Sequence, residues 1–145
     1  MQYESMPLPE GEFDLIYADP PWQYEKGSVS KSRRIENHYP TIPFEEIKEL
    51  KIPAAKNSIL YLWATAPKLP EALEVMKAWG FTYRTCSIWD KIFLGMGYWF
   101  RIQHELLLVG IKGKFFAPEP KNRFRSVYHE NRGKHSKKPD YYYEI

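Results

Sequence analysis

An aspartate, two prolines and a tryptophan follow the apolar run 13–18, as Asp19, Pro20, Pro21 and Trp22. The exocyclic amino group of adenine or cytosine has two N–H donors, which the Asp19 carboxylate and a proline carbonyl can accept while Trp22 stacks on the ring. Proline lacks an N–H and has a fixed φ, so the turn that presents these acceptors is stiff. Because two acceptors on the amino hydrogens help to free the nitrogen lone pair, the tetrapeptide indicates methylation of such a nitrogen. The alternative is a plain strand end with a core tryptophan.

The elements that must position this tetrapeptide alternate between strand and helix. Short apolar runs bounded by turn residues predict strands over 13–18, 58–64, 83–89 and 105–110, and apolar spacing predicts helices after Thr41, across 70–79 and from 141 to 145. Leu73, Met76 and Trp79 form the expected apolar face of the middle helix. Strand, helix and strand in that order imply a right-handed parallel crossover, so the fold class is α/β with a mostly parallel sheet.

Further polar and aromatic residues lie where the expected strands begin or end. Trp89 and Lys91 close the third strand, Trp99 lies in a glycine-flanked segment, and Glu105 opens the fourth strand. In parallel α/β sheets ligands bind at the carboxyl ends of strands, so we expect these residues to share a pocket with Asp19. The alternative for Glu105 by itself is a solvated residue at a strand edge. The alternative for Trp89 by itself is a core residue.

Length and composition bound the class of protein. The chain of 145 residues and 17.3 kDa suits a single domain with a substantial core. No apolar stretch approaches the roughly 18–20 residues of a membrane span, and the first residues lack the order of a signal peptide, so a soluble, cytoplasmic protein is expected. The lone Cys86 excludes an internal disulfide and a cysteine-based zinc cluster, and the histidines show no ligand pairing, so no metal is expected.

Positive charge is concentrated toward the C-terminal end of the sequence. The segment 121–138 holds seven basic residues against one acid, for a charge of +6 where the whole chain carries +3. Phe124 and Tyr128 interleave with these charges, a pattern that suits a nucleic-acid backbone, and a second basic stretch lies within 23–40. The side chains expected on phosphates are Arg33, Arg34, Arg123, Arg125 and Lys134. A solvated loop is the alternative for the whole segment.

With these residues in view, the chain resembles the adenine 6-amino methyltransferases that carry a D-P-P-W signature. This is the family of the eukaryotic messenger-RNA adenosine methyltransferase and of its bacterial and phage DNA-modifying relatives. The resemblance covers almost the whole chain and rests on an ordered series of motifs. They are Tyr17-Ala18-Asp19-Pro20-Pro21-Trp22, Tyr39-Pro40-Thr41, Leu62-Trp63-Ala64-Thr65, Trp89-Asp90-Lys91, Gly97-Tyr98-Trp99 ahead of Glu105, Val109-Gly110-Ile111-Lys112-Gly113 and His135-Ser136-Lys137-Lys138-Pro139-Asp140.

The resemblance implies a Rossmann-like fold that uses S-adenosylmethionine to methylate the amino group of adenine in nucleic acid, with DNA favoured over RNA and a bacterial or phage source. The catalytic residues are then Asp19, Pro20, Pro21 and Trp22, and the cofactor is held by Asp19 and Lys138. The residues implied around the base are Tyr24, Trp89, Lys91, Trp99 and Glu105. A homo-oligomer or a partner subunit is left open.

Relatives continue past the lysine-proline-aspartate helix into a last strand of the type E-L-F-A-R and a tryptophan-glycine-asparagine segment, and this sequence has neither. We therefore expect one methyltransferase domain over 1–145, truncated at its C-terminus, with a sheet that lacks its last strand. Two rival functions stay open. One is a non-catalytic or cofactor-deficient nucleic-acid-binding relative that acts as a partner subunit, and the other is a methyltransferase for small molecules or proteins.

Overall fold

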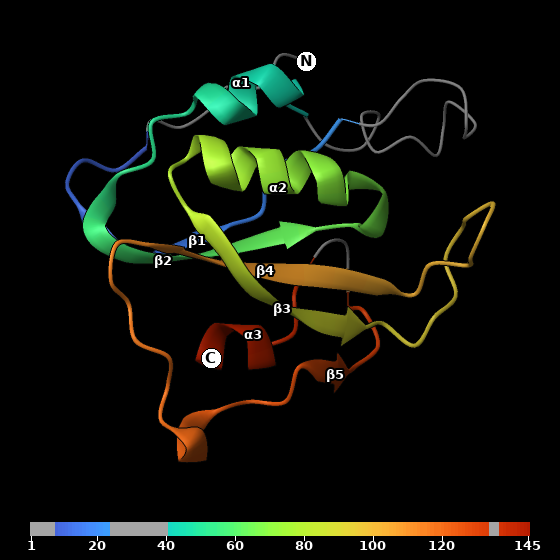
Figure 1. Ribbon diagram of the computed structural model, residues 1–145. Coiled ribbons are helices and arrows are strands. Elements are labelled where there is room, and N and C mark those ends of the chain that lie inside the picture. The colour runs from blue at the N-terminus through green and yellow to red at the C-terminus, as the bar shows by residue number, and fades with distance from the viewer. Residues whose placement is uncertain (1–7, 24–40, 134–136) are drawn as a thin grey trace.

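The computed structural model describes residues 8–23, 41–133 and 137–145. Five strands form one sheet: β1 (Phe13–Ala18), β2 (Ala54–Ala64), β3 (Thr82–Asp90), β4 (His104–Lys112) and β5 (Val127–His129). The α-helices are α1 (Phe44–Glu49), α2 (Leu69–Ala78) and α3 (Tyr141–Glu144), and short 3-10 helices span Ala66–Lys68 (η3) and Pro120–Asn122 (η4). Helices α1 and α2 lie on one face of the sheet and α3 lies on the other (Figure 1). Within the described residues, no helix is long and apolar enough to cross a membrane.

The sheet is mixed, with the strand order β1-β2-β4-β3-β5. β1 pairs in parallel with β2, β4 runs antiparallel to both β2 and β3, and β5 pairs in parallel with β3. Four strands therefore run in one direction and β4 runs in the other, which confirms the predicted α/β fold with a mostly parallel sheet. The predicted crossover through α2 also holds in direction, but β4 is inserted between β2 and β3. The strand β5, inside the basic segment, was not foreseen.

Helix α2 packs on the sheet through a different stripe from the one that the sequence suggested. Ala72, Val75, Met76 and Trp79 are all buried, whereas Leu73 is 37% exposed. These four positions have the i, i+3, i+4, i+7 spacing of one helical face. The predicted helix is confirmed, and the prediction that Leu73 lies on its buried face is wrong by one position.

The first strand occupies an edge of the sheet. The apolar run 13–18 is typical of a short buried strand, but Phe13 and Leu15 are 41% and 50% exposed, because β1 pairs on one side only, with β2. An edge strand keeps unpaired N–H and C=O groups along its open side. The open side of β1 lies at a cavity of about 450 Å³, which is lined by residues of β1, of α1 and of the turn after β1.

Two groups of buried side chains flank the sheet. The larger group lies between the sheet and α1 and α2, and includes Ile47, Leu60 and Met76. The smaller group is mostly aromatic and joins Trp63, Trp89, Leu107 and Tyr142. Because α3 contributes Tyr142 to the smaller group, the C-terminal helix covers the second face of the sheet next to the strand ends (Figure 1).

Candidate active site

The reversed direction of β4 explains how a residue at a strand start joins residues at strand ends. β3 ends at Asp90, and Trp89 lies opposite Glu105 in the β3–β4 ladder. Asp19 follows the last residue of β1, whose neighbour β2 ends at Ala64. Since β4 is antiparallel to β2 and β3, its first residues lie at the edge where those strands finish. The predicted pocket edge therefore includes Asp19, Trp89 and Glu105.

A buried lysine joins the two carboxylates at this edge. The Lys138 ammonium lies 3.3 Å from both carboxylate oxygens of Glu105 and 3.5 Å from Oδ2 of Asp19. A second lysine, Lys91, lies 3.3 Å from Oε2 of Glu105. The side chain of Lys138 is only 6% exposed, so its charge is held by these carboxylates rather than by water. The formal charges of the four side chains cancel.

The aromatic group packs against the same ammonium. The Lys138 nitrogen lies 4.7 Å from the ring centroid of Trp63 and 5.8 Å from that of Trp89, within the range of a cation–π contact. The Trp63 indole N–H donates to the Tyr17 hydroxyl at 2.9 Å, and burial raises the pKa of Tyr17 to about 12. Tyr17 therefore stays neutral across the physiological range and accepts this bond. Trp63 and Tyr17 were expected only as parts of the family motifs, and no role was predicted for either side chain.

Asp19 is the more open of the two carboxylates. Its side chain is 45% exposed, against 14% for Glu105. Burial of the carboxyl raises the pKa of Asp19, Lys138 acts to lower it, and the charge of Glu105 raises it further. Asp19 is thus a stronger base than a fully solvated aspartate, and one side of it is open to a ligand.

The two prolines form a tight turn after Asp19. The Trp22 N–H donates to the Pro20 carbonyl at 2.9 Å, and the Ile42 N–H donates to the Pro21 carbonyl at 3.0 Å. Both proline carbonyls, expected to be free acceptors, are therefore already engaged, although a carbonyl has a second lone pair. The bond to Ile42 ties this turn to the chain just ahead of α1.

Two tryptophans that were expected to stack on a base are buried. Trp22 is 6% exposed and its indole N–H donates to the Trp63 carbonyl at 3.3 Å, while Trp89 is 2% exposed and donates to the Glu130 carbonyl at 2.8 Å. Neither ring offers an open face, so the geometry supports packing roles for both. Trp99, by contrast, is 95% exposed.

Asp90 is a polar residue at this edge that sequence reasoning left without a role. Its carboxylate accepts from the Ile92 N–H at 2.8 Å and from the Gln103 amide at 2.9 Å, and it lies 2.8 Å from Nδ1 of His129. The Gln103 bond, followed by the bonds from Ile92 and His129, lowers the pKa of Asp90. Its position directly after Trp89 was the available signal. Asp90 ties β5 to both ends of the segment between β3 and β4.

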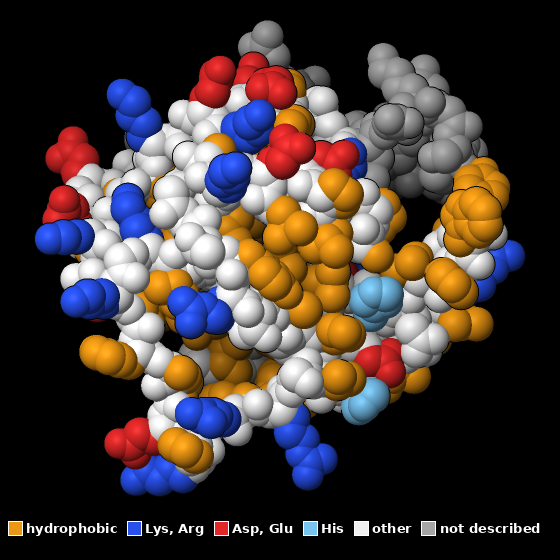
Figure 2. Space-filling model, viewed as in Figure 1, with side chains coloured by type: hydrophobic (Ala, Val, Ile, Leu, Met, Phe, Trp, Pro, Cys, Tyr) orange, Lys and Arg blue, Asp and Glu red, His pale blue; other side chains and the backbone are white. Residues whose placement is uncertain are grey.

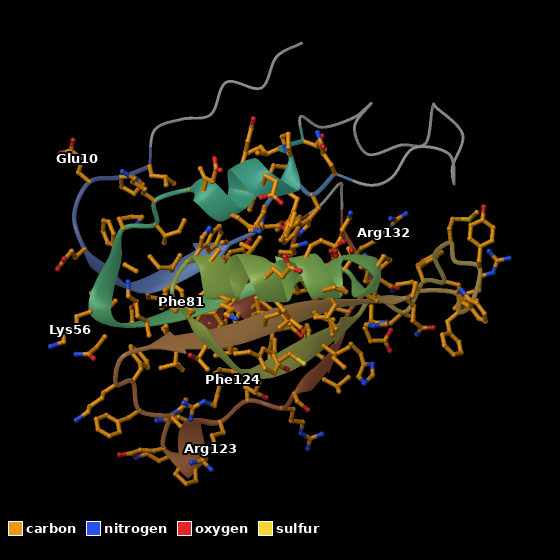
Figure 3. All side chains as sticks on the ribbon, turned by 45° about the horizontal axis from the view of Figure 1, so that its top comes forward. Glu10, Lys56, Phe81, Arg123, Phe124 and Arg132 are labelled. Carbon is orange, nitrogen blue, oxygen red and sulfur yellow. The ribbon has the colours of Figure 1, made fainter. Side chains whose placement is uncertain are left out.

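The structure describes two of the basic side chains that were predicted to contact phosphates, those of Arg123 and Arg125. Arg123 and Arg125 are exposed, and Arg123 Nε donates to the Pro118 carbonyl at 3.1 Å. In Figure 3, Arg123 lies below β3, whereas Arg132 lies at the end of the sheet that carries the site. The predicted residues Tyr24, Arg33, Arg34 and Lys134 lie outside the described residues.

The cavity beside β1 begins at the same turn. Asp19, Pro20 and Pro21 line it together with apolar residues such as Ile16 and Trp79. Its volume of about 450 Å³ is within the range of small-molecule sites. An anionic group at one end of a mainly apolar cavity suits a ligand that combines a positive charge with a flat ring. S-Adenosylmethionine has both, so the residues present fit this cofactor.

A family model matches this chain over almost its whole length. The model is described as MT-A70, and the matched residues are 13–145. The chain belongs to the MT-A70 family. The match begins at the first residue of β1 and includes the D-P-P-W turn, Glu105 and Lys138, so the resemblance inferred from the motifs is confirmed.

Three known proteins are similar to this chain in sequence. The type II methyltransferase M.MunI of Mycoplasma sp is 32% identical over 151 residues, which cover 91% of this chain. A probable N(6)-adenosine-methyltransferase MT-A70-like of Oryza sativa subsp. japonica and an N(6)-adenosine-methyltransferase MT-A70-like protein of Drosophila melanogaster are 31% and 30% identical, each over 71% of this chain. The chain spans 65% of the length of the first relative, and 15% and 17% of the other two.

Proposed function

We propose that this protein transfers a methyl group from S-adenosylmethionine to the exocyclic amino group of adenine in a nucleic acid. The observation that carries the proposal is the half-open Asp19 carboxylate, held by the buried Lys138 at a strand end of an MT-A70 family member. The two relatives named as N(6)-adenosine methyltransferases support the choice of the 6-amino nitrogen as acceptor.

The side chains of this chain would position the base and receive its proton. When bound, S-adenosylmethionine supplies an electrophilic methyl group, and the cavity lined by Asp19 and the apolar residues of β1 would hold it. The open oxygen of Asp19 accepts one N–H of the adenine amino group, and the second lone pair of the Pro20 carbonyl suits the other. An amino nitrogen that gains a methyl group must lose a proton, and burial raises the pKa of Asp19 and so fits it to take that proton.

Lys138 acts on the reaction through the carboxylates that it holds. Its ammonium contacts Glu105 and Asp19 and has little exposed surface, so it orients these groups rather than reaching out to a ligand. Lys91 contacts Oε2 of Glu105, one of the two oxygens that Lys138 also contacts. With both lysines in place, Glu105 is a rigid acceptor beside the site. Most of the rate enhancement would then come from positioning and from preorganised charge.

DNA is proposed ahead of RNA as the acceptor strand. The relative from Mycoplasma sp is named a type II methyltransferase rather than an adenosine methyltransferase, which supports testing DNA first. The exposed arginines Arg123, Arg125 and Arg132 would contact phosphates of either polymer. The rival of a cofactor-deficient binding partner predicts nucleic-acid binding without binding of S-adenosylmethionine.

The test is transfer of a labelled methyl group from S-adenosylmethionine to adenine-containing DNA and RNA oligonucleotides. Asp19→Asn should lose about a hundredfold or more in rate, because one end of the new amide is a donor that faces the donors of the base. Asp14→Asn, a change of the same kind at an exposed position of β1, is the matched control and should keep the wild-type rate. Turnover by Asp19→Asn at the wild-type rate would contradict the proposed role of Asp19.

A further inference from the structure

The segment between β3 and β4, residues 91–103, exposes a run of large apolar side chains and is called the apolar loop below. It projects beyond the ends of β3 and β4, and hydrophobic side chains gather on it in the space-filling view (Figures 1 and 2). The exposed members are Ile92, Phe93, Leu94, Met96, Tyr98, Trp99 and Phe100. Continuous exposed apolar surface of this kind usually marks an interaction site.

The neck of the apolar loop is held in one conformation. Oδ1 of Asp90 accepts from the Ile92 N–H and from the Gln103 side chain, one residue from each end of the loop. Further out, the Gly95 N–H donates to the Ile102 carbonyl at 2.8 Å. These bonds join the two arms of the loop, so its tip is presented by an ordered base rather than by a free chain.

Glycine is required where the two arms approach most closely. A Cβ on Gly97 would collide with the Phe100 carbonyl oxygen, and a Cβ on Gly95 would come within 2.5 Å of the Ile102 carbonyl oxygen. Ile92 adopts a φ of +69°, which a β-branched residue rarely does. The strained backbone of Ile92 and the two tightly packed glycines lie next to three consecutive aromatic residues, 98–100. Backbone strain of this kind is found at functional contacts.

The charge of the apolar loop favours a negatively charged partner. The segment 91–103 contains Lys91 and Arg101 and no acidic residue. Lys91 is also the residue that braces Glu105, so the loop starts inside the candidate site. Bases offer flat rings beside phosphates, and exposed aromatic and basic side chains in combination are the usual platform for unpaired bases.

We propose that the apolar loop is a nucleic-acid contact in which Trp99 stacks on an unpaired base of the strand that carries the target adenine. The inference rests on the proposed function in its choice of a nucleic acid as partner. The family resemblance already places Trp99 near the base, and the proposal gives it the stacking role that was expected of Trp22 and Trp89, because its ring is open. A second copy of this chain is the competing occupant of the surface, and the experiment below separates the two.

The distribution of tryptophans makes the test direct. All five tryptophans of the sequence lie in the described part of the chain, and four of them, Trp22, Trp63, Trp79 and Trp89, are at most 7% exposed. Fluorescence that acrylamide can quench therefore reports on Trp99. We expect a mixed-sequence single-stranded oligodeoxynucleotide to quench this component and to shield it from acrylamide, whereas heparin, which has charge without bases, should do neither.

Variants at the loop tip connect this signal to binding. Trp99→Ser should weaken binding of a labelled oligodeoxynucleotide, measured by anisotropy, by about 5- to 150-fold, the range expected for the loss of one stacked base. Trp99→Phe keeps a stacking ring and should retain most of the affinity, while the quenchable fluorescence disappears. Phe116→Ser removes an aromatic ring of similar exposure from the loop after β4 and should leave the affinity close to wild type.

Three results would overturn the proposal. They are an oligonucleotide that binds without any change at Trp99, an oligonucleotide that does not bind at all, and a Trp99 that protein concentration alone shields from acrylamide, which would assign the surface to a second copy. The experiment uses neither cofactor nor methyl transfer. Stacking of Trp99 on the oligonucleotide without any methylation would therefore contradict only the proposed function. Methylation of DNA with no change in Trp99 fluorescence would contradict only this inference.

Discussion

Trp89 and Trp99 belong to neighbouring segments and have opposite surroundings. Trp89 is 2% exposed, lies opposite Glu105 in a central ladder and donates its indole N–H to a backbone carbonyl, whereas Trp99 is 95% exposed on the apolar loop. The first ring therefore contributes to the folding of the domain, and the second is exposed surface, where we propose that a base stacks. The residue type is the same, so the difference comes from position in the sheet.

The lysines show the same contrast. Lys138 is 6% exposed and contacts two carboxylates and two indole rings, whereas Lys121 is 79% exposed and lies 3.7 Å from Glu119, which is 73% exposed. A buried ion pair is costly to break because one charge is left without a partner, whereas a solvated pair is replaced by water. The strand-end cluster is thus a place where single substitutions have large effects.

The largest difference is expected between the two tryptophans. Trp89→Ala should lower the free energy of unfolding by about 3–5 kcal/mol, through lost burial and the cavity that remains. Trp99→Ala should change the free energy of unfolding by no more than about 0.5 kcal/mol, because the Trp99 ring stays exposed to water in the folded protein. Urea unfolding of both variants measures this. A similar loss in the two would show that the apolar loop packs on the domain in solution.

A second comparison concerns the lysines. Lys138→Met should lower the free energy of unfolding by about 3 kcal/mol. This is the low end of the range for breaking a buried ion pair, because Asp19 is half exposed to water. Lys121→Met is the matched control and should cost less than about 1 kcal/mol. Urea unfolding at neutral pH compares them. Should the two variants have equal stability, Lys138 would be no more than a surface residue.

The smallest expected effect is a pH dependence at the neck of the apolar loop. Hydrogen bonds from Gln103, Ile92 and His129 lower the pKa of Asp90 from its ordinary 3.8, so its stabilising contribution is fully present above that value and is lost as the pH falls through the lowered one. The free energy of unfolding of Asp90→Asn should therefore be lower than that of the wild type by a constant amount near neutral pH. The difference between the two proteins should disappear below about pH 4.

Acid unfolding of Asp90→Asn and the wild type, followed by far-ultraviolet circular dichroism, checks this expectation. Burial raises the pKa of Asp19, so the effect of Asp19 on the pH dependence of stability has the opposite sign. Asp19 is present in both proteins, so its effect cancels in the difference between them. A gap that is unchanged at every pH would mean that the carboxylate of Asp90 does not hold the neck through its charge.

Local patterns predicted most of the elements. The apolar run that ends just ahead of Asp19 predicted β1 at its observed bounds, and the cap and stop residues predicted α1, α2 and α3. The three-residue β5 was missed, because it lies in a polar segment and exists only through its pairing with β3. The face of α2 was misjudged by one position, since Ala72 and Leu73 compete for it and only packing on the sheet selects between them.

The candidate site was predictable as a set of residues and not as an arrangement. Asp19, Glu105 and Lys138 stood out from the tetrapeptide, the strand start and the family motifs. That Lys138 points inward against two indole rings, and that Trp22 is part of the core, did not follow from residue types. A lysine or a tryptophan suits both a ligand contact and a buried position, and burial is a property of the assembled sheet.

The sequence by itself determined the order of strands and helices apart from β5, the D-P-P-W turn at a strand end and membership of the MT-A70 family. The tertiary structure decided the antiparallel direction of β4, which brings Glu105 to the edge that holds Asp19, and the contact between Glu105 and Lys138, 33 residues apart. The physical reason is range. Periodicity, caps and turns act between near neighbours in the chain, whereas strand direction and burial depend on which distant surfaces pack together.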